Sequence, residues 1–279
     1  MDSDRKIGKR MIKLDEKNIM TFENHSSKGN QLKWKCENVW YKSDYTGYEG
    51  LVEYTVSKLL EKASLNSGEF ISYETEQISY KHSLLRGCKS FDFLEDTWQI
   101  ITLERLYSTQ YGRSFIQDVW KIPGIEERLT FLVDQVELLT SIANFGNYIC
   151  KMLTIDAFFL NEDRHLHNIA VLMNQKGEMK LCPYFDHGAA LLADTTLDYP
   201  LGADIYTLMK DVKGKTLCED FDEALDTAEN LFGKHIRFNF SKTDVKNILL
   251  EAEYYTEQEK IRVETVIYNQ MDKYQYLFV

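Results

Sequence analysis

The pattern of apolar and polar residues divides the chain into a strand-rich first part and a helical second part. Aromatic and β-branched residues, which favour strands, dominate four early segments: residues 18–23, 31–42, 70–79 and 98–106. A polar turn is expected at residues 24–30. Within residues 48–62 the apolar positions recur every three or four residues, which predicts one helix among the strands.

The pattern becomes helical after about residue 112. A long amphipathic run covers residues 132–160. Two short apolar segments, 169–173 and 179–182, then flank the polar turn 174–177, which predicts a β-hairpin. Further helices are expected near residues 219–231, 242–253 and 257–273.

Composition narrows the classes of function. A net charge of −11 argues against direct binding to nucleic acid, because phosphate backbones attract a basic surface. The apolar region at residues 142–160 contains polar and charged residues, so we expect a core helix and no membrane interaction. The 5 cysteines form no C-x-x-C pair and the first residues are polar, which together predict a cytoplasmic protein with reduced thiols.

The strongest chemical signal is the sequence NEDRHLHN at residues 161–168, followed by DHG at residues 186–188. Phosphoryl transfer from a nucleotide needs a carboxylate that orients the attacking hydroxyl, and oxygen ligands that hold Mg²⁺ against the phosphates. Asp163 is the candidate catalytic base, and Asn168 and Asp186 are the candidate metal ligands. Their order, after a long helix and on both sides of a hairpin, is that of kinases. The sequence therefore predicts an α+β, two-lobed, protein-kinase-like fold.

The upstream half of a kinase site needs a lysine on a strand and a glutamate on the adjoining helix. Lys42 ends a predicted strand, and Glu53 lies on the predicted helix that follows. We expect Lys42 to hold the nucleotide phosphates and Glu53 to orient it. Lys33 and Lys35 lie on the same predicted strand and are the competing candidates.

Two backbone segments are expected to complete the nucleotide site. Ser27, Lys28 and Gly29 belong to a turn whose N–H groups would cover the phosphates, although it has only one glycine. Glu104 and Leu106 lie where the chain should pass from the small lobe, residues 1–106, to the large lobe, residues 107–279. Their backbone groups are the candidates for hydrogen bonds to adenine, and an ordinary edge strand is the alternative.

Two other interpretations of the central motif stay open. Asp163 and Asn168 could cap a turn, since Asp and Asn favour such positions. Asp163, His165 and His167, together with His187, could also bind zinc in a hydrolase, although no H-E-x-x-H motif is present.

Several segments resemble the HipA-like serine/threonine kinases of bacteria. Residues 156–169, DAFFLNEDRHLHNI, are similar to the family's catalytic-loop signature, and residues 181–188, LCPYFDHG, to its magnesium segment. Residues 47–53 and 103–105 are similar to its helix and hinge segments. The resemblance implies ATP and Mg²⁺ as cofactors and a protein substrate bearing Ser or Thr. It gives Asp163, Asn168, Asp186 and Lys42 the roles described above.

The early start of the strands resembles the short, CtkA-type form of this family. Longer members carry an extra N-terminal subdomain, on which partnership with a DNA-binding antitoxin depends, so an antitoxin partner is left open and is not predicted. The resemblance also implies autophosphorylation in the phosphate-covering loop, at Ser26 or Ser27. The motifs D-R-H-x-x-N and D-H-G are shared with phosphatidylinositol kinases, so a lipid kinase is one alternative. A nucleotide-binding pseudokinase is another.

Overall fold

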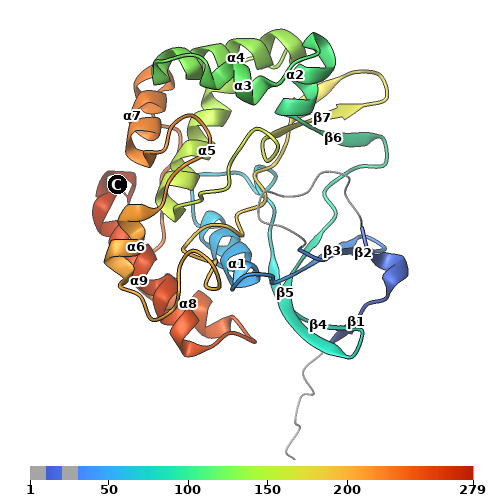
Figure 1. The fold of residues 1–279 in the computed structure, drawn as a ribbon, viewed down its shortest axis with the longest axis vertical. Helices are drawn as coiled ribbons and strands as arrows, with labels where there is room; N and C mark the ends of the chain where they lie inside the picture. The colour runs from blue at the N-terminus through green and yellow to red at the C-terminus, as the bar shows by residue number, and fades with distance from the viewer. Residues whose placement is uncertain (1–10, 21–30, 279) are drawn as a thin grey trace, which may run out of the picture.

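Two β-sheets and a set of helices make up the fold (Figure 1). The structure, a computed structural model, describes residues 11–20 and 31–278. The first sheet has five strands in the order β1-β4-β5-β3-β2, and the second has three in the order β6-β7-β8. The strands of the first sheet are β1 Ile12–Lys13, β2 Lys33–Cys36, β3 Val39–Ser43, β4 Glu74–Tyr80 and β5 Ser83–Phe91.

The hairpin of β2 and β3 replaces the single strand predicted at residues 31–42. Glu37, between the two strands, has a φ of 53°, which reverses the chain direction within one tight turn. The pairing places Lys33 directly opposite Lys42. The two lysines therefore project from the same face of the sheet.

Strand β5 was not predicted, although it lies at the centre of this sheet between β4 and β3. Its sequence, SLLRGCKSF, places Arg86 and Gly87 in the middle and shows no regular alternation. Gly87 allows close contact with the neighbouring strand, because a Cβ there would overlap the carbonyl oxygen of Lys42. Pairing with a strand on each side thus compensates for weak local strand preference.

Helix α1, Glu49–Leu60, lies between the first sheet and the C-terminal helices and confirms the predicted helix. Ten of its 12 residues are buried, including Glu53. A Cβ at Gly50 would lie 2.5 Å from both the Gly87 backbone and the Tyr255 hydroxyl, so glycine permits this close packing. Because α1 is enclosed on both sides, the position of Glu53 is fixed.

The large lobe is helical, as predicted. Its core helix α5, Phe145–Phe159, has 13 of 15 residues buried. The predicted run 132–160 is two helices, because Ser141 and Asn144 have left-handed backbones with φ of 59° and 62°. The other helices are α2 Leu103–Tyr111, α3 Phe115–Trp120, α4 Ile125–Thr140, α6 Ile205–Asp211, α7 Phe221–Phe232, α8 Lys242–Glu251 and α9 Glu257–Lys273.

The second sheet shifts the division between the two lobes. Its strands are β6 Trp98–Thr102, β7 Ala170–Asn174 and β8 Met179–Leu181. Because β6 pairs along its whole length with β7, it belongs with the large lobe, and the chain crosses between the sheets at residues 92–97 instead of near residue 106. The predicted strand 98–106 ends at Thr102, whose hydroxyl caps α2 by accepting from the N–H of Arg105.

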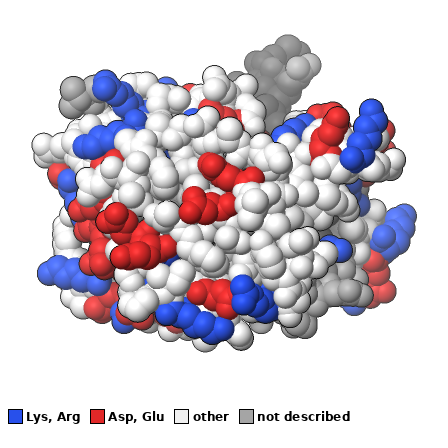
Figure 2. Space-filling view, turned by 90° about the horizontal axis from the view of Figure 1, so that it is seen from above, with Lys and Arg blue, Asp and Glu red and all other residues white. Residues whose placement is uncertain are grey.

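One face of the molecule carries many acidic side chains, in line with the net charge of −11. Figure 2 shows the face on which α2, α3 and α4 lie, where acidic side chains gather in clusters and Lys and Arg lie mostly toward the edges. Within residues 11–20 and 31–278, no helix combines the length and apolar character needed to cross a membrane.

Candidate active site

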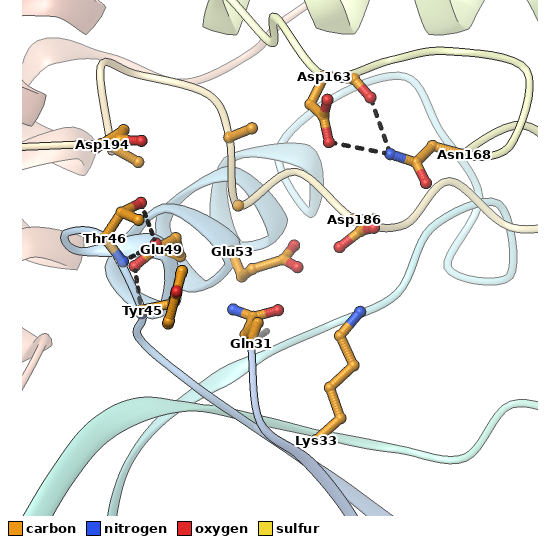
Figure 3. A pocket seen from close by; sticks show the side chains of 13 residues that line it. Gln31, Lys33, Tyr45, Thr46, Glu49, Glu53, Asp163, Asn168, Asp186 and Asp194 are labelled. Carbon is orange, nitrogen blue, oxygen red and sulfur yellow. Dashed lines mark hydrogen bonds between the residues drawn. The ribbon is translucent and has the colours of Figure 1, made fainter. Parts of the chain in front are cut away.

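A cavity between the two lobes collects side chains from both (Figure 3). The β2 strand and the residues before it supply Gln31 and Lys33, and α1 supplies Glu49 and Glu53. The large lobe supplies the three residues of the central motif, which are Asp163, Asn168 and Asp186. The structure therefore brings the predicted base and both predicted metal ligands to one cavity.

Lys42 joins Glu53 to Asp186, two of the residues that line this cavity. Its Nζ lies 2.7 Å from Glu53 Oε1 and 3.0 Å from Asp186 Oδ1. The side chains of Lys42 and Glu53 are 14% and 2% exposed. Lys35, the other competitor on the hairpin, instead forms an ion pair with Asp92. The geometry thus selects Lys42 as the lysine that contacts both partner carboxylates.

The charges of this triad stabilise each other. Burial alone would lower the pKa of Lys42, but the carboxylates of Asp186 and Glu53 outweigh it and raise that pKa well above its usual value. Burial alone would likewise raise the pKa of Asp186, but Lys42 and Lys33 outweigh it and lower that pKa far below its usual value. Lys42 is therefore a cation and Asp186 an anion at neutral pH.

The D-H-G segment turns sharply at its aspartate. Asp186 has a φ of 61°, an unusual conformation for a residue with a side chain. At this turn Asp186 projects to Lys42, whereas the next residue, His187, is buried and donates its backbone N–H to Glu53 Oε2 at 2.9 Å. Burial and the charge of Arg164 hold the pKa of His187 well below its usual range, so this histidine is neutral.

Asp163 and Asn168 are held together by the catalytic-loop candidate. The Asn168 side-chain amide donates to the backbone oxygen of Asp163 at 2.8 Å and approaches Asp163 Oδ2 at 3.4 Å. Because the amide nitrogen is used in this way, the amide oxygen remains the group that Asn168 offers to the cavity, on the side where Asp186 lies (Figure 3). Asn168 and Asp186 supply the oxygen atoms that a hard cation such as Mg²⁺ prefers.

Arg164 holds these segments in place, although the sequence motif did not indicate this role. Its side chain is 2% exposed, pairs with Asp156 of α5, and donates to the backbone oxygens of Asn168 and Phe185 at 3.1 and 2.8 Å. It therefore connects the core helix α5 to Asn168 and to Phe185, the residue that precedes Asp186. A signal was present, because Asp156 is a lone acidic residue inside an apolar helix and a buried charge requires a partner.

Lys33 is the second lysine of the site. It lines the cavity, and Figure 3 shows its ammonium group extending toward Asp186. Its charge contributes to the lowered pKa of Asp186. From the sequence alone Lys33 was only a competitor of Lys42, whereas the structure places both on the same face of one hairpin.

The structure argues against the predicted role of Glu104 and Leu106. The backbone N–H of Glu104 already donates to the oxygen of Leu166 at 3.2 Å, and its carboxylate accepts from the N–H of Ile116. Leu106 lies inside α2, where backbone groups bond to each other. Neither residue can therefore offer its N–H to an adenine edge.

Two further predictions concern other parts of the site. Ser26 and the predicted phosphate-covering residues Ser27, Lys28 and Gly29 lie outside the described residues. Among the residues that the structure describes, no group of three His, Cys, Asp or Glu side chains could hold a metal ion. The zinc interpretation also conflicts with His187, whose Nδ1 faces the Arg164 cation at 3.2 Å.

A small sheet with one enclosed helix, a helical lobe, and a lysine–glutamate–aspartate triad between them define a kinase-like fold. No family model matches the sequence, and no curated protein matches it either. The structure is similar to that of the proinflammatory kinase CtkA of Helicobacter pylori, with a TM-score of 0.60, 14% identity and 96% of each chain covered. The predicted two-lobed fold of the CtkA type is thereby confirmed.

A second solved structure is more distant. HipA of Shewanella oneidensis MR-1, in a complex with HipB and its operator DNA, gives a TM-score of 0.43 at 12% identity. The match covers 93% of this chain and 63% of HipA, so the chain spans less than two thirds of that protein.

Proposed function

We propose that this protein is an ATP- and Mg²⁺-dependent kinase that transfers the γ-phosphoryl group to serine or threonine hydroxyls of a protein. The observation that carries the proposal is that Glu53, Asp163, Asn168 and Asp186 line one cavity, and that Lys42 bonds to two of them, Glu53 and Asp186. These residues come from both lobes and supply the groups that phosphoryl transfer requires.

The donor set fits a magnesium ion. Asp186 offers an ionised carboxylate and Asn168 a neutral amide oxygen, both hard ligands on the same cavity. Bound Mg²⁺ would neutralise charge on the phosphates of the nucleotide. Lys42 would contact those phosphates, and Glu53 would hold the lysine side chain in position. Phe93 and Leu94, two apolar residues of the segment that crosses between the lobes, pack next to β7. They would flank the adenine ring of the nucleotide.

Asp163 would act on the acceptor. Its carboxylate aligns the substrate hydroxyl and takes the proton as the hydroxyl oxygen bonds to the γ-phosphorus. The bond between that phosphorus and the bridging oxygen breaks, and ADP leaves with the electron pair. The Arg164 network fixes the loop that carries Asp163, so the carboxylate needs little reorganisation during the reaction.

Magnesium-dependent transfer of radioactive phosphate from ATP tests the proposal. We expect the purified protein to label itself or a generic protein acceptor, and Asp163→Ala to lose at least about 99% of the rate while still binding Mg²⁺–ATP. Asp134→Ala, which removes an exposed carboxylate of α4, is the matched control and should keep full activity. Undiminished transfer by Asp163→Ala would contradict the role of this residue.

The acceptor distinguishes the competing functions. Mass spectrometry of labelled protein should find phosphoserine or phosphothreonine, and Ser26 and Ser27 are the first positions to inspect. Transfer to phosphoinositide vesicles without transfer to protein would instead indicate a lipid kinase. Thermal stabilisation by Mg²⁺–ATP without any transfer would indicate a pseudokinase.

A further inference from the structure

Lys215 places a positive charge beside the candidate base from outside the catalytic loop. It lies between α6 and α7, and its Nζ is 3.6 Å from Asp163 Oδ1. The same ammonium group also acts on His165. Burial lowers the pKa of this histidine, and the charge of Lys215 lowers it further. The lysine is thus close to Asp163 and His165, although it lies far from them in the sequence.

The backbone around Lys215 is fixed on two sides. Thr216, which is buried, donates its hydroxyl to the backbone oxygen of Arg164 at 2.6 Å. The next residue, Leu217, is buried, and its backbone oxygen accepts from Arg128 of α4 at 2.7 Å. These anchors tie the segment directly to the loop that carries Asp163. The position of Lys215 beside Asp163 is therefore a property of the fold.

Stability does not account for this placement. The Lys215 side chain is 46% exposed, and an ion pair in such a position contributes little to the free energy of folding. Lys213, two residues upstream, shows what a surface lysine of this segment does: it extends into solvent and pairs with Glu219 at 2.6 Å. Lys215 instead turns to the site.

The position of Lys215 complements the other two lysines of the site. Lys42 and Lys33 project from the sheet, opposite the metal-ligand candidate Asp186. Lys215 lies beside Asp163, where the acceptor hydroxyl would be aligned. The phosphoryl group passes from the first position to the second, and its charge is best stabilised by a cation at the receiving end.

We propose that Lys215 is a further catalytic residue, whose ammonium group contacts the transferring phosphoryl group while Asp163 aligns the hydroxyl. The inference rests on the proposed function. It adds a positive charge beside Asp163, where the acceptor hydroxyl would bind, and this charge comes from a residue outside the catalytic loop.

Steady-state kinetics of three variants test this role. Lys215→Ala should lower kcat about 10- to 100-fold with little change in the KM for ATP, because the contact forms only during transfer. Lys215→Arg should recover part of the loss by restoring the charge. Lys213→Ala removes an equal charge from the same segment and should behave like the unmodified protein.

Binding of a transition-state mimic provides a readout that does not depend on turnover. We expect Lys215→Ala to bind Mg²⁺–ADP normally and to lose about 10-fold or more in affinity when aluminium fluoride is added as a mimic of the phosphoryl group in flight. Equal trapping by Lys215→Ala and the unmodified protein would overturn the inference, as would an unchanged kcat or a loss confined to the KM for ATP.

The two proposals fail in different ways. An unmodified protein without any transfer activity would refute the proposed function, and this inference with it. An active protein whose Lys215→Ala variant is equally active would refute the inference alone.

Discussion

Replacement of Lys42 by methionine tests how much the ion pairs of Lys42 with Glu53 and Asp186 contribute to the free energy of unfolding. Methionine has a similar length but no charge, so the variant would leave the carboxylates of Glu53 and Asp186 near each other without their shared cation. Glu53 is 2% exposed, and water cannot replace the lost partner. Breaking a buried ion pair in this way costs about 3–5 kcal/mol of the free energy of unfolding.

Urea unfolding at pH 7 measures this loss. With an m value of about 3 kcal/mol/M, the expected loss lowers the midpoint urea concentration by about 1–2 M. Lys213→Met is the matched control, because it removes a lysine whose ion pair with Glu219 is largely exposed. We expect its midpoint to match that of the unmodified protein.

The effect should depend on pH in a defined direction. In the unmodified protein the pKa of Asp186 is lowered from its ordinary value of 3.8, so its contribution to stability is present above pH 3.8 and is lost as the pH falls toward the folded pKa. The Lys42→Met substitution removes the largest favourable part of that contribution, while the charges of Lys33 and Arg164 remain. The difference in stability between the two proteins should therefore be largest near neutral pH and should shrink in acid.

A second substitution separates charge from packing. Adding Asp186→Asn to Lys42→Met removes one of the unbalanced carboxylates and should restore part of the lost stability. An unchanged urea midpoint for Lys42→Met, or a loss that neither acid nor Asp186→Asn reduces, would refute the reasoning.

Two further substitutions probe the supports of the site. Gly87→Ala should lower the free energy of unfolding by about 1–3 kcal/mol and weaken ATP binding, because the new Cβ would overlap the backbone at Lys42. Gly68→Ala is the control, because a Cβ at that position contacts no other atom. Calorimetry of nucleotide binding and thermal unfolding measure both effects, and equal values for the two variants would contradict the packing argument. Arg164→Met should destabilise by about 3–5 kcal/mol in urea unfolding, because Asp156 would stay buried without its cation; a loss below about 1 kcal/mol would count against it.

Local sequence was sufficient to predict the helices and strands near the central motif, residues 161–168. Helix α1, the hairpin of β7 and β8, and the last three helices were predicted because each has a clear period of apolar residues or a polar turn. The order of Asp163, Asn168 and Asp186 also predicted one shared cavity, since a hairpin between two loops brings their ends together. The two-lobed fold followed from this order.

Strand β5 was determined by its neighbours in space, whereas the start of α2 depends on a local capping residue. Strand β5 forms because partners on both sides satisfy its backbone, whatever its own preference. The strand expected up to residue 106 ends at Thr102 because that side chain caps a helix, so Glu104 and Leu106 lie in α2.

The identity of the cations was decided only by the tertiary structure. The sequence offered Lys33, Lys35 and Lys42 on one predicted strand, and the hairpin register and the packing of α1 decided which of them meets Glu53. Lys215 gave no local signal, because its position beside Asp163 depends on the contacts of a segment distant in sequence. Electrostatic interaction depends on distance through space, and only the packing of the two lobes sets that distance.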